Sequence, residues 1–331
     1  MTKASRGYLV RLGISVTALV GLSFLLEPRE VASRLSGLRP GWVGAALGVS
    51  VAQVILSAWR WRFTAARLGV DIPLRRAISE YYLGTFLNQV LPGGVLGDVS
   101  RAWRHARAEP DLVSTPRIHA VVFERTSGQA VMTGVALASG AVVLMGTSAG
   151  GARSLAPAAS IPAWIVLPAL VAAALTIAWV AAGLLRRAFG ADPVGRFLED
   201  ARSSLWGSAF PVQVATSLVI VASYVVVYLF AARAVGVDTS TAVLLPLAPL
   251  VLVTMLLPIS VAGWGVREGA AAALWSSMGL TPTDGVAISV AYGLLVLISS
   301  LPGALVLLAT VRADGAPGRR GGPGRTESVA R

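Results

Sequence analysis

Long apolar runs with few charges constrain the fold of this chain more than any other feature. Apolar residues make up 55% of its 331 residues and charged residues only 13%. A helix needs about 20 apolar residues to cross the hydrocarbon core of a bilayer, so each long run predicts a membrane span. The runs that are long enough cover residues 8–26, 41–59, 118–146, 162–185, 211–233 and 285–311. The sequence therefore predicts an all-α polytopic membrane protein with about six full spans.

Two further apolar regions, 78–100 and 242–279, are interrupted by proline and glycine and share a pattern. The stretches "LPGGVLGDVSR" from Leu91 and "LPISVAGWGVR" from Leu257 have Leu, Pro, Val, Gly and Arg at the same offsets. Proline removes a backbone donor and breaks a helix, and glycine lets the backbone turn or be approached closely. We expect both regions to be broken, re-entrant helices; two ordinary kinked helices with chance matches are the alternative. The expected hinge residues are Pro92, Gly93, Gly94, Gly97, Pro258, Gly263 and Gly265.

The positive charges predict how the chain is oriented in a cell membrane, because Lys and Arg accumulate in cytoplasmic loops. Most of the 28 Lys and Arg residues fall on the cytoplasmic side if both termini are cytoplasmic and each broken region returns to the side it came from. The first broken region then enters from the cytoplasm and the second from outside, as an inverted repeat. Interrupted segments in such positions point to a transporter's substrate site. Residues 1–311 are expected to form one transmembrane domain and residues 312–331 a disordered cytoplasmic tail.

Composition excludes several other functions. The net charge of +12 is explained by cytoplasmic loops, and no module that reads nucleic acid accompanies it. Cysteine is absent, which excludes disulfides and thiolate chemistry. His105 and His119 lack the helical spacing of a metal site, and no ATP-binding loop is present, so we expect no metal and no cofactor.

Several charged residues fall inside the predicted membrane regions, where each costs about 2.5–3.5 kcal/mol on insertion scales. We expect Arg101 and Arg267 to pair with neighbouring carboxylates and to leave an arginine able to bind a phosphate through its planar fork. The alternative is structural, with pairs that only pin the half-helices in place. The charged residues concerned are Glu80, Asp98, Arg101, Glu124, Arg125, Arg267 and Glu268.

Two polar groups near these regions have simpler expected roles. The run from Trp59 to Arg62 is predicted to form an interfacial belt of aromatic and snorkelling side chains at a membrane edge. Asn88 and Gln89, just before the first break, are predicted to satisfy backbone carbonyls that the break sets free.

Four motifs together resemble a known family. In chain order, "RWRFTAARLGV", "YYLGTFLNQVLPGGVLGDVSRAW", "VVFERTSGQ" and "LPISVAGWGVREGA" are similar to the signatures of the lysylphosphatidylglycerol synthase transmembrane-region family, and the resemblance runs from Leu9 to Val311. It implies a helical flippase that moves a lipid or lipid-linked headgroup between leaflets. Proteins with the fused form carry a soluble aminoacyl-transferring domain that these motifs do not include, so no lysyltransferase activity is expected. The substrate-binding residues that the resemblance implies are Asp98, Arg101, Glu124, Arg125, Ser260, Arg267 and Glu268.

Three functions remain open from the sequence. A translocase would bind a phospholipid or a polyprenyl-linked lipid, with its headgroup meeting Arg101 or Arg267. A membrane-embedded transferase would use Asp98 and Glu124 for acid and base chemistry. A non-transporting protein would serve as the membrane partner of a separately encoded lipid-modifying enzyme. A homo-oligomer is compatible with each of them.

Overall fold

The computed structural model of the chain describes residues 28–91, 96–107, 115–148, 193–257 and 260–314, with a few isolated positions before residue 28. These ranges are helical and contain no strand, as the apolar runs predict. The predicted span 162–185 and most of 8–26 lie outside the described residues. So do four of the expected hinges, which are Pro92, Gly93, Gly94 and Pro258.

Four stretches are long and apolar enough to cross a membrane, and they coincide with four of the predicted runs. Each of the helices that form them has a proline among its first two residues, where its missing N–H costs nothing. The helices are α3 (Pro40–Arg67), α6 (Thr115–Ser148), α9 (Phe210–Ala234, preceded by the 3₁₀ turn Gly207–Ala209) and α12 (Pro282–Ser300) with α13 (Pro302–Asp314). The stretches are Pro40–Arg67, Thr115–Met145, Gly207–Ala234 and Pro282–Thr310.

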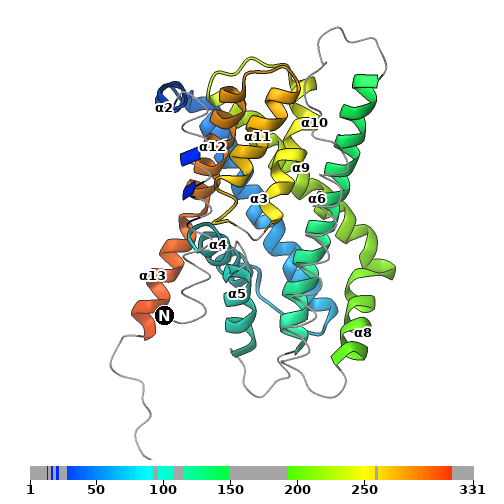
Figure 1. Ribbon diagram of the computed structural model, residues 1–331. Helices are drawn as coiled ribbons and strands as arrows, with labels where there is room; N and C mark the ends of the chain where they lie inside the picture. The colour runs from blue at the N-terminus through cyan, green and yellow to red at the C-terminus, as the bar shows by residue number, and fades with distance from the viewer. Residues whose placement is uncertain are drawn as a thin grey trace, which may run out of the picture.

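Both predicted broken regions contain two helices separated by a break. In the first, α4 (Leu74–Val90) is followed by α5 (Leu96–Arg107). In the second, α10 (Thr241–Leu252) and the 3₁₀ turn Val253–Leu256 are followed by α11 (Val266–Ser277). Figure 1 shows α5 running to the lower end of the molecule, whereas α10 and α11 lie in the upper half. The two broken segments therefore occupy opposite halves of the bundle.

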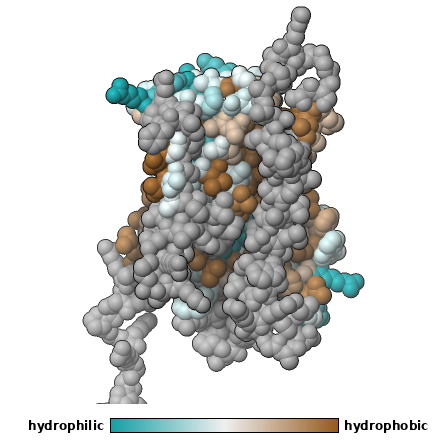
Figure 2. All heavy atoms as spheres, in the orientation of Figure 1, coloured by the Kyte–Doolittle hydropathy of each residue, from teal (hydrophilic) through white to brown (hydrophobic). Residues whose placement is uncertain are grey.

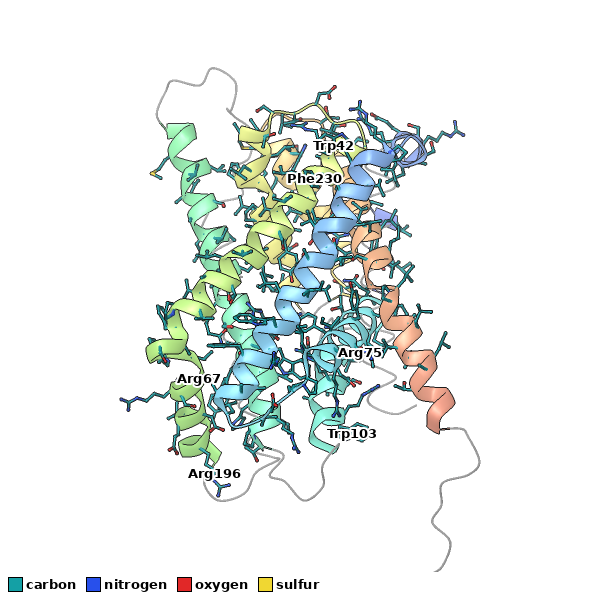
Figure 3. All side chains as sticks on the ribbon, turned by 180° about the vertical axis from the view of Figure 1, so that it is seen from behind. Trp42, Arg67, Arg75, Trp103, Arg196 and Phe230 are labelled. Carbon is teal, nitrogen blue, oxygen red and sulfur yellow. The ribbon has the colours of Figure 1, made fainter. Side chains whose placement is uncertain are left out.

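The helices α3 and α9 pack antiparallel to each other and form the central pair of the bundle. At the upper end the Arg39 amide donates to the Ala234 carbonyl at 3.0 Å, and the rings of Trp42 and Phe230 are 5.3 Å apart (Figure 3). At the lower end Arg67 Nε donates to the Ser203 carbonyl at 3.2 Å, and Ser203 lies on α8 (Pro193–Leu205). The short helix α2 (Pro28–Ser36) covers the upper end of α12.

The glycines described in the two breaks are explained by close packing of the backbone in the first break and by positive φ angles in the second. Gly97 lies directly on Gly84, and a Cβ at Gly97 would overlap the Gly84 carbonyl and stand 2.8 Å from Asn88 Oδ1. In the second break the chain turns through left-handed backbone at Ala262, Gly263 and Gly265, with φ of 51°, 82° and 85°. Glycine adopts such φ values freely, which is why two of these three positions carry it.

The outer surface is apolar along the sides of the bundle. Figure 2 shows hydrophobic residues on the side of the described part and hydrophilic residues gathered at its upper end. Leu305 of α13 is 68% exposed, and Val219 of α9 and Met145 of α6 are also largely exposed. A surface of this kind is favourable against lipid tails. One boundary differs from expectation, because α13 continues to Asp314 and so includes the first three residues of the predicted tail.

Candidate functional site

A cavity of about 180 Å³ lies inside the bundle, between α3, α4, α6, α9 and α12. The last turn of α4 lines it with Asn88 and Gln89, and the second broken segment lines it with Met255 and Ala262. The cavity is thus the place where the two broken segments, far apart in the sequence, meet the long helices. Its charged lining residues, within the described part of the chain, are Arg60, Glu124 and Arg125.

Glu124 is the centre of the charge network beside this cavity. Its Oε1 accepts from Arg60 Nη2 at 2.5 Å and from the Tyr81 hydroxyl at 3.3 Å, and its Oε2 accepts from Arg101 Nη2 at 3.1 Å. Arg60 also donates to the Ser217 hydroxyl at 2.7 Å. The carboxylate is fully buried, so these donors replace the water that a buried charge requires. Side chains from α3, α4 and α5 thus converge on this carboxylate of α6, and α9 is joined to them through Ser217 and Arg60.

Asp98 is the second carboxylate of the network and connects the first break to α6. It pairs with Arg101 Nη2 at 3.1 Å and with Arg125 Nε at 3.4 Å. Asn88 Nδ2 donates to Asp98 at 3.0 Å, while Asn88 Oδ1 accepts from the Gly97 amide at 2.7 Å. The Asn88 side chain therefore bridges α4 and the start of α5. Asn88 was predicted to donate to a backbone carbonyl that the break sets free. That prediction was wrong in detail, because the Asn88 side chain instead accepts from a free backbone amide, that of Gly97.

Arg101 is enclosed rather than open to a ligand. Only 2% of the residue is exposed. Its guanidinium lies 4.6 Å from the ring centroids of both Trp61 and Tyr81, in addition to its two carboxylate partners. The two carboxylates and the two aromatic faces compensate the charge of Arg101, although its Nε has no hydrogen-bond partner among the described residues.

Arg125 differs from Arg101 because its side chain is 37% exposed and lines the cavity. Its Nε stands beside Asp98, and within the described residues its guanidinium makes no hydrogen bond of good geometry. Arg60 Nε and Arg101 Nε also lack a hydrogen-bond partner among the described residues, but both side chains are buried. Of the three guanidinium groups of the network, that of Arg125 is therefore the exposed one whose planar fork has donors left for a ligand. The open guanidinium expected of Arg101 or Arg267 is therefore found at Arg125.

Arg267 and Glu268 form a separate, buried cluster at the start of α11. Arg267 Nη2 lies 2.6 Å from Glu268 Oε1, and Arg267 Nε donates to Ser289 Oγ of α12 at 2.8 Å. Glu268 Oε2 accepts from the Gly265 amide at 2.7 Å, which caps the first turn of α11. Neither charge lines the cavity described above. This geometry ties α11 to α12.

The remaining predicted residues lie near the two clusters. Ser260 is buried, and its hydroxyl has no hydrogen-bond partner among the described residues. Glu80 pairs with Arg104 at 3.0 Å, which holds α4 to α5. No group of three or more metal-ligating side chains occurs in the described ranges.

The expected interfacial belt was wrong for two of its members. Arg60 and Trp61 are buried and belong to the network, whereas Trp59 is 37% exposed on the outside. Helical periodicity contained the signal, because Ser57, Arg60 and Thr64 recur at intervals of three and four and lie on one buried face of α3.

The glutamines of the cavity were also missed. Gln53 of α3 and Gln129 of α6 line it together with Gln89. A lone glutamine in an apolar helix is a weak sequence signal, since an amide can equally satisfy backbone groups. Only the packing of α3, α4 and α6 brings the three amides to one space.

The fold and the site together define a polytopic helical membrane protein with an interior cavity whose lining combines apolar side chains with a few charged and polar ones. A family model described as the lysylphosphatidylglycerol synthase TM region matches residues 8–303, which is most of the chain. The protein belongs to this family, as the four motifs predicted. A search of curated proteins found no match, and a search of solved structures found none either.

Proposed function

We propose that this protein is a lipid translocase, in which an anionic headgroup passes through the cavity while the lipid tails remain in the bilayer. The observation that carries the proposal is the side chain of Arg125, a partly open guanidinium that faces a cavity with polar and apolar lining inside an apolar helical bundle. Moving an isolated charged group into hydrocarbon costs tens of kcal/mol by Born solvation. A cavity that offers polar lining groups and one open cation supplies the compensation that the bilayer lacks.

The two broken segments support a path from either side. We take α4–α5 and α10–α11 as re-entrant halves of an inverted repeat, one entering from each face of the membrane. Both segments line the cavity, through Asn88 and Gln89 on one side and Met255 and Ala262 on the other. Rocking of one repeat against the other would open the cavity alternately to the two faces, as in transporters built on interrupted helices.

The basic residues support a cytoplasmic assignment for the lower end. Arg67, Arg75 and Arg196 all lie in the lower half of the molecule (Figure 3), as expected of a cytoplasmic face. We therefore propose that both termini are cytoplasmic and that the protein resides in the cell membrane. Under this assignment α4–α5 is the cytoplasmic re-entrant segment.

The test is a leaflet-resolved assay in proteoliposomes with a fluorescent phosphatidylglycerol, in which external dithionite reports the lipid that reaches the outer leaflet. Wild type, Arg125→Gln and the matched control Arg196→Gln are compared, since Arg196 is exposed on α8, away from the cavity. We expect Arg125→Gln to lose at least about tenfold in rate, equivalent to about 1.4 kcal/mol, and Arg196→Gln to match wild type.

Equal rates in all three proteins would remove Arg125 from the transport path. A folded wild-type protein that moves no lipid, and that co-purifies with a lipid-modifying enzyme, would instead support the non-transporting partner.

A further inference from the structure

We infer that the cavity selects lipids with one phosphodiester and an uncharged, hydroxylated headgroup, and that it rejects headgroups carrying an added ammonium, such as a lysyl ester. The inference takes from the proposed function only that the cavity is the headgroup site. It concerns binding, so it can stand or fall independently of transport.

The charge of the network favours a monoanion. Among the described residues it contains three arginines, which are Arg60, Arg101 and Arg125, and two carboxylates, Asp98 and Glu124, so its net charge is +1. The positive excess is accessible at Arg125. One phosphodiester brings this region to neutrality, whereas a diphosphate would add negative charge for which the network has no second open cation.

The neighbouring breaks do not change this balance. Residues 92–95 read Pro-Gly-Gly-Val and residues 258–259 read Pro-Ile, so neither adds a charge by sequence. The pair Arg267 and Glu268 is neutral and hydrogen-bonded within itself. The excess at Arg125 is therefore not cancelled by these nearby segments.

A cationic headgroup would find no open carboxylate among these residues. Glu124 is fully buried under Arg60, Arg101 and the Tyr81 hydroxyl. Asp98 is shared between Arg101, Arg125 and the Asn88 amide, with only 15% of its side chain exposed. A lysyl ammonium would have to displace an arginine from one of these ion pairs, or stand unpaired beside Arg125. Like charges so placed repel each other, and an unpaired ammonium pays its desolvation cost without compensation.

The rest of the polar lining suits hydroxyl groups. Gln53, Gln89 and Gln129 line the cavity, and their amides make no side-chain hydrogen bond to the part of the chain that the structure describes. A carboxamide both donates and accepts, which matches a hydroxyl that does the same. Glycerol and sugar headgroups present several such hydroxyls beside one phosphate.

The size of the cavity sets what enters it. About 180 Å³ is less than the roughly 300–1,000 Å³ typical of pockets for drug-sized ligands. A phosphate with a glycerol or one sugar ring is therefore the scale of group expected inside, and the tails remain outside.

The test is equilibrium binding by calorimetry to the full chain in detergent. The probes are short-chain phosphatidylglycerol, its lysyl ester, phosphatidylmethanol, and a short-chain polyprenyl-phosphate hexose. Phosphatidylmethanol has the same charge as phosphatidylglycerol but no headgroup hydroxyl. We expect phosphatidylglycerol or the hexose lipid to bind at least about tenfold more tightly than the lysyl ester. The tighter of the two identifies glycerol or sugar as the preferred headgroup.

Two variants separate the charge from the hydroxyl contacts. Arg125→Gln should lower the affinity for every anionic probe by about tenfold. The difference in affinity between these probes and the lysyl ester should therefore become smaller. Gln129→Met keeps the side-chain length but removes the amide. It should therefore lower the affinity for phosphatidylglycerol several-fold and leave the affinity for phosphatidylmethanol unchanged.

Binding of the lysyl ester as tight as that of phosphatidylglycerol would overturn the inference, as would no binding of any probe. Selective binding without lipid movement in vesicles would uphold the inference and refute the proposed translocase.

Discussion

Arg60 and Glu124 stand 64 positions apart in the chain, yet their side chains form a buried ion pair with 2.5 Å between Nη2 and Oε1. The contact joins α3 to α6 at the wall of the cavity. Glu124 also binds Arg101, and Arg101 shares Asp98 with Arg125, so the Arg60–Glu124 pair is connected to both arginines.

Arg60→Gln should destabilise the protein by about 3–5 kcal/mol, because it leaves Glu124 buried with one guanidinium fewer. The measurement is denaturant unfolding in detergent, followed by tryptophan fluorescence. Arg62→Gln, on the same helix and partly exposed, is the control and should stay near the wild-type value. Equal unfolding of the two variants would show that the Arg60 pair adds nothing to stability.

Gly97→Ala should impair folding, since the added methyl would overlap the Gly84 carbonyl and crowd Asn88 Oδ1. Size-exclusion chromatography of the solubilised protein would report the loss as a smaller monodisperse peak. Gly134→Ala is the matched control, because a Cβ at that helical position meets nothing within 4 Å and alanine favours the helix by about 1 kcal/mol. A monodisperse Gly97→Ala protein in wild-type yield would contradict the close packing of α4 on α5.

Arg267→Gln should act as a folding defect rather than as a selective loss of transport. It leaves Glu268 buried without its cationic partner, at a cost of about 3–5 kcal/mol. Ser289→Ala removes two hydrogen bonds, one accepted from Arg267 Nε and one donated to Glu268 Oε1, and should cost less, about 1–3 kcal/mol. Thermal unfolding in detergent ranks the two. A stable Arg267→Gln protein that has lost lipid movement would return Arg267 to the list of substrate contacts.

Asp200→Ala should loosen α8 from α6, where Asp200 Oδ2 lies 2.6 Å from Nδ1 of the buried His119. Phe197 packs edge-on against the same imidazole at 5.2 Å, so both contacts fix one face of α8. Limited trypsin digestion at Arg196 and Arg202 should become several-fold faster, as local opening becomes easier. The control is Glu199→Ala, an exposed neighbour. Unchanged cleavage after Asp200→Ala would mean that the other contacts of α8, including the aromatic ones and the Arg67–Ser203 hydrogen bond, hold it without the Asp200–His119 pair.

The positions of spans and breaks could be predicted because their causes are local. A run of about 20 apolar residues requires a spanning helix whatever surrounds it, and four such runs are found as helices. The described glycines of the breaks behave likewise, since Gly263 and Gly265 take backbone angles that other residues avoid. The family could also be identified from the sequence, because the four motifs and their order along the chain can be read without knowing the fold.

The identity of the open arginine could not be predicted in this way. Arg101, Arg125 and Arg267 each stand within three residues of a carboxylate, and all three look alike in the sequence. Their environments differ. Trp61 of α3 and Tyr81 of α4 enclose Arg101. Arg267 is hydrogen-bonded to Ser289 of α12. Arg125 alone among these three turns a partly open guanidinium to the cavity.

The sequence by itself therefore determined the class of protein, the described spans, the broken helices and the family, because hydropathy and backbone chemistry act over a few residues. Only the tertiary structure decided that Arg60 turns inward, that Glu124 binds two arginines, and that three glutamines share one cavity with Arg125. Those contacts depend on the rotation of each helix about its axis and on which helices become neighbours. Both are set by packing between segments far apart in the chain.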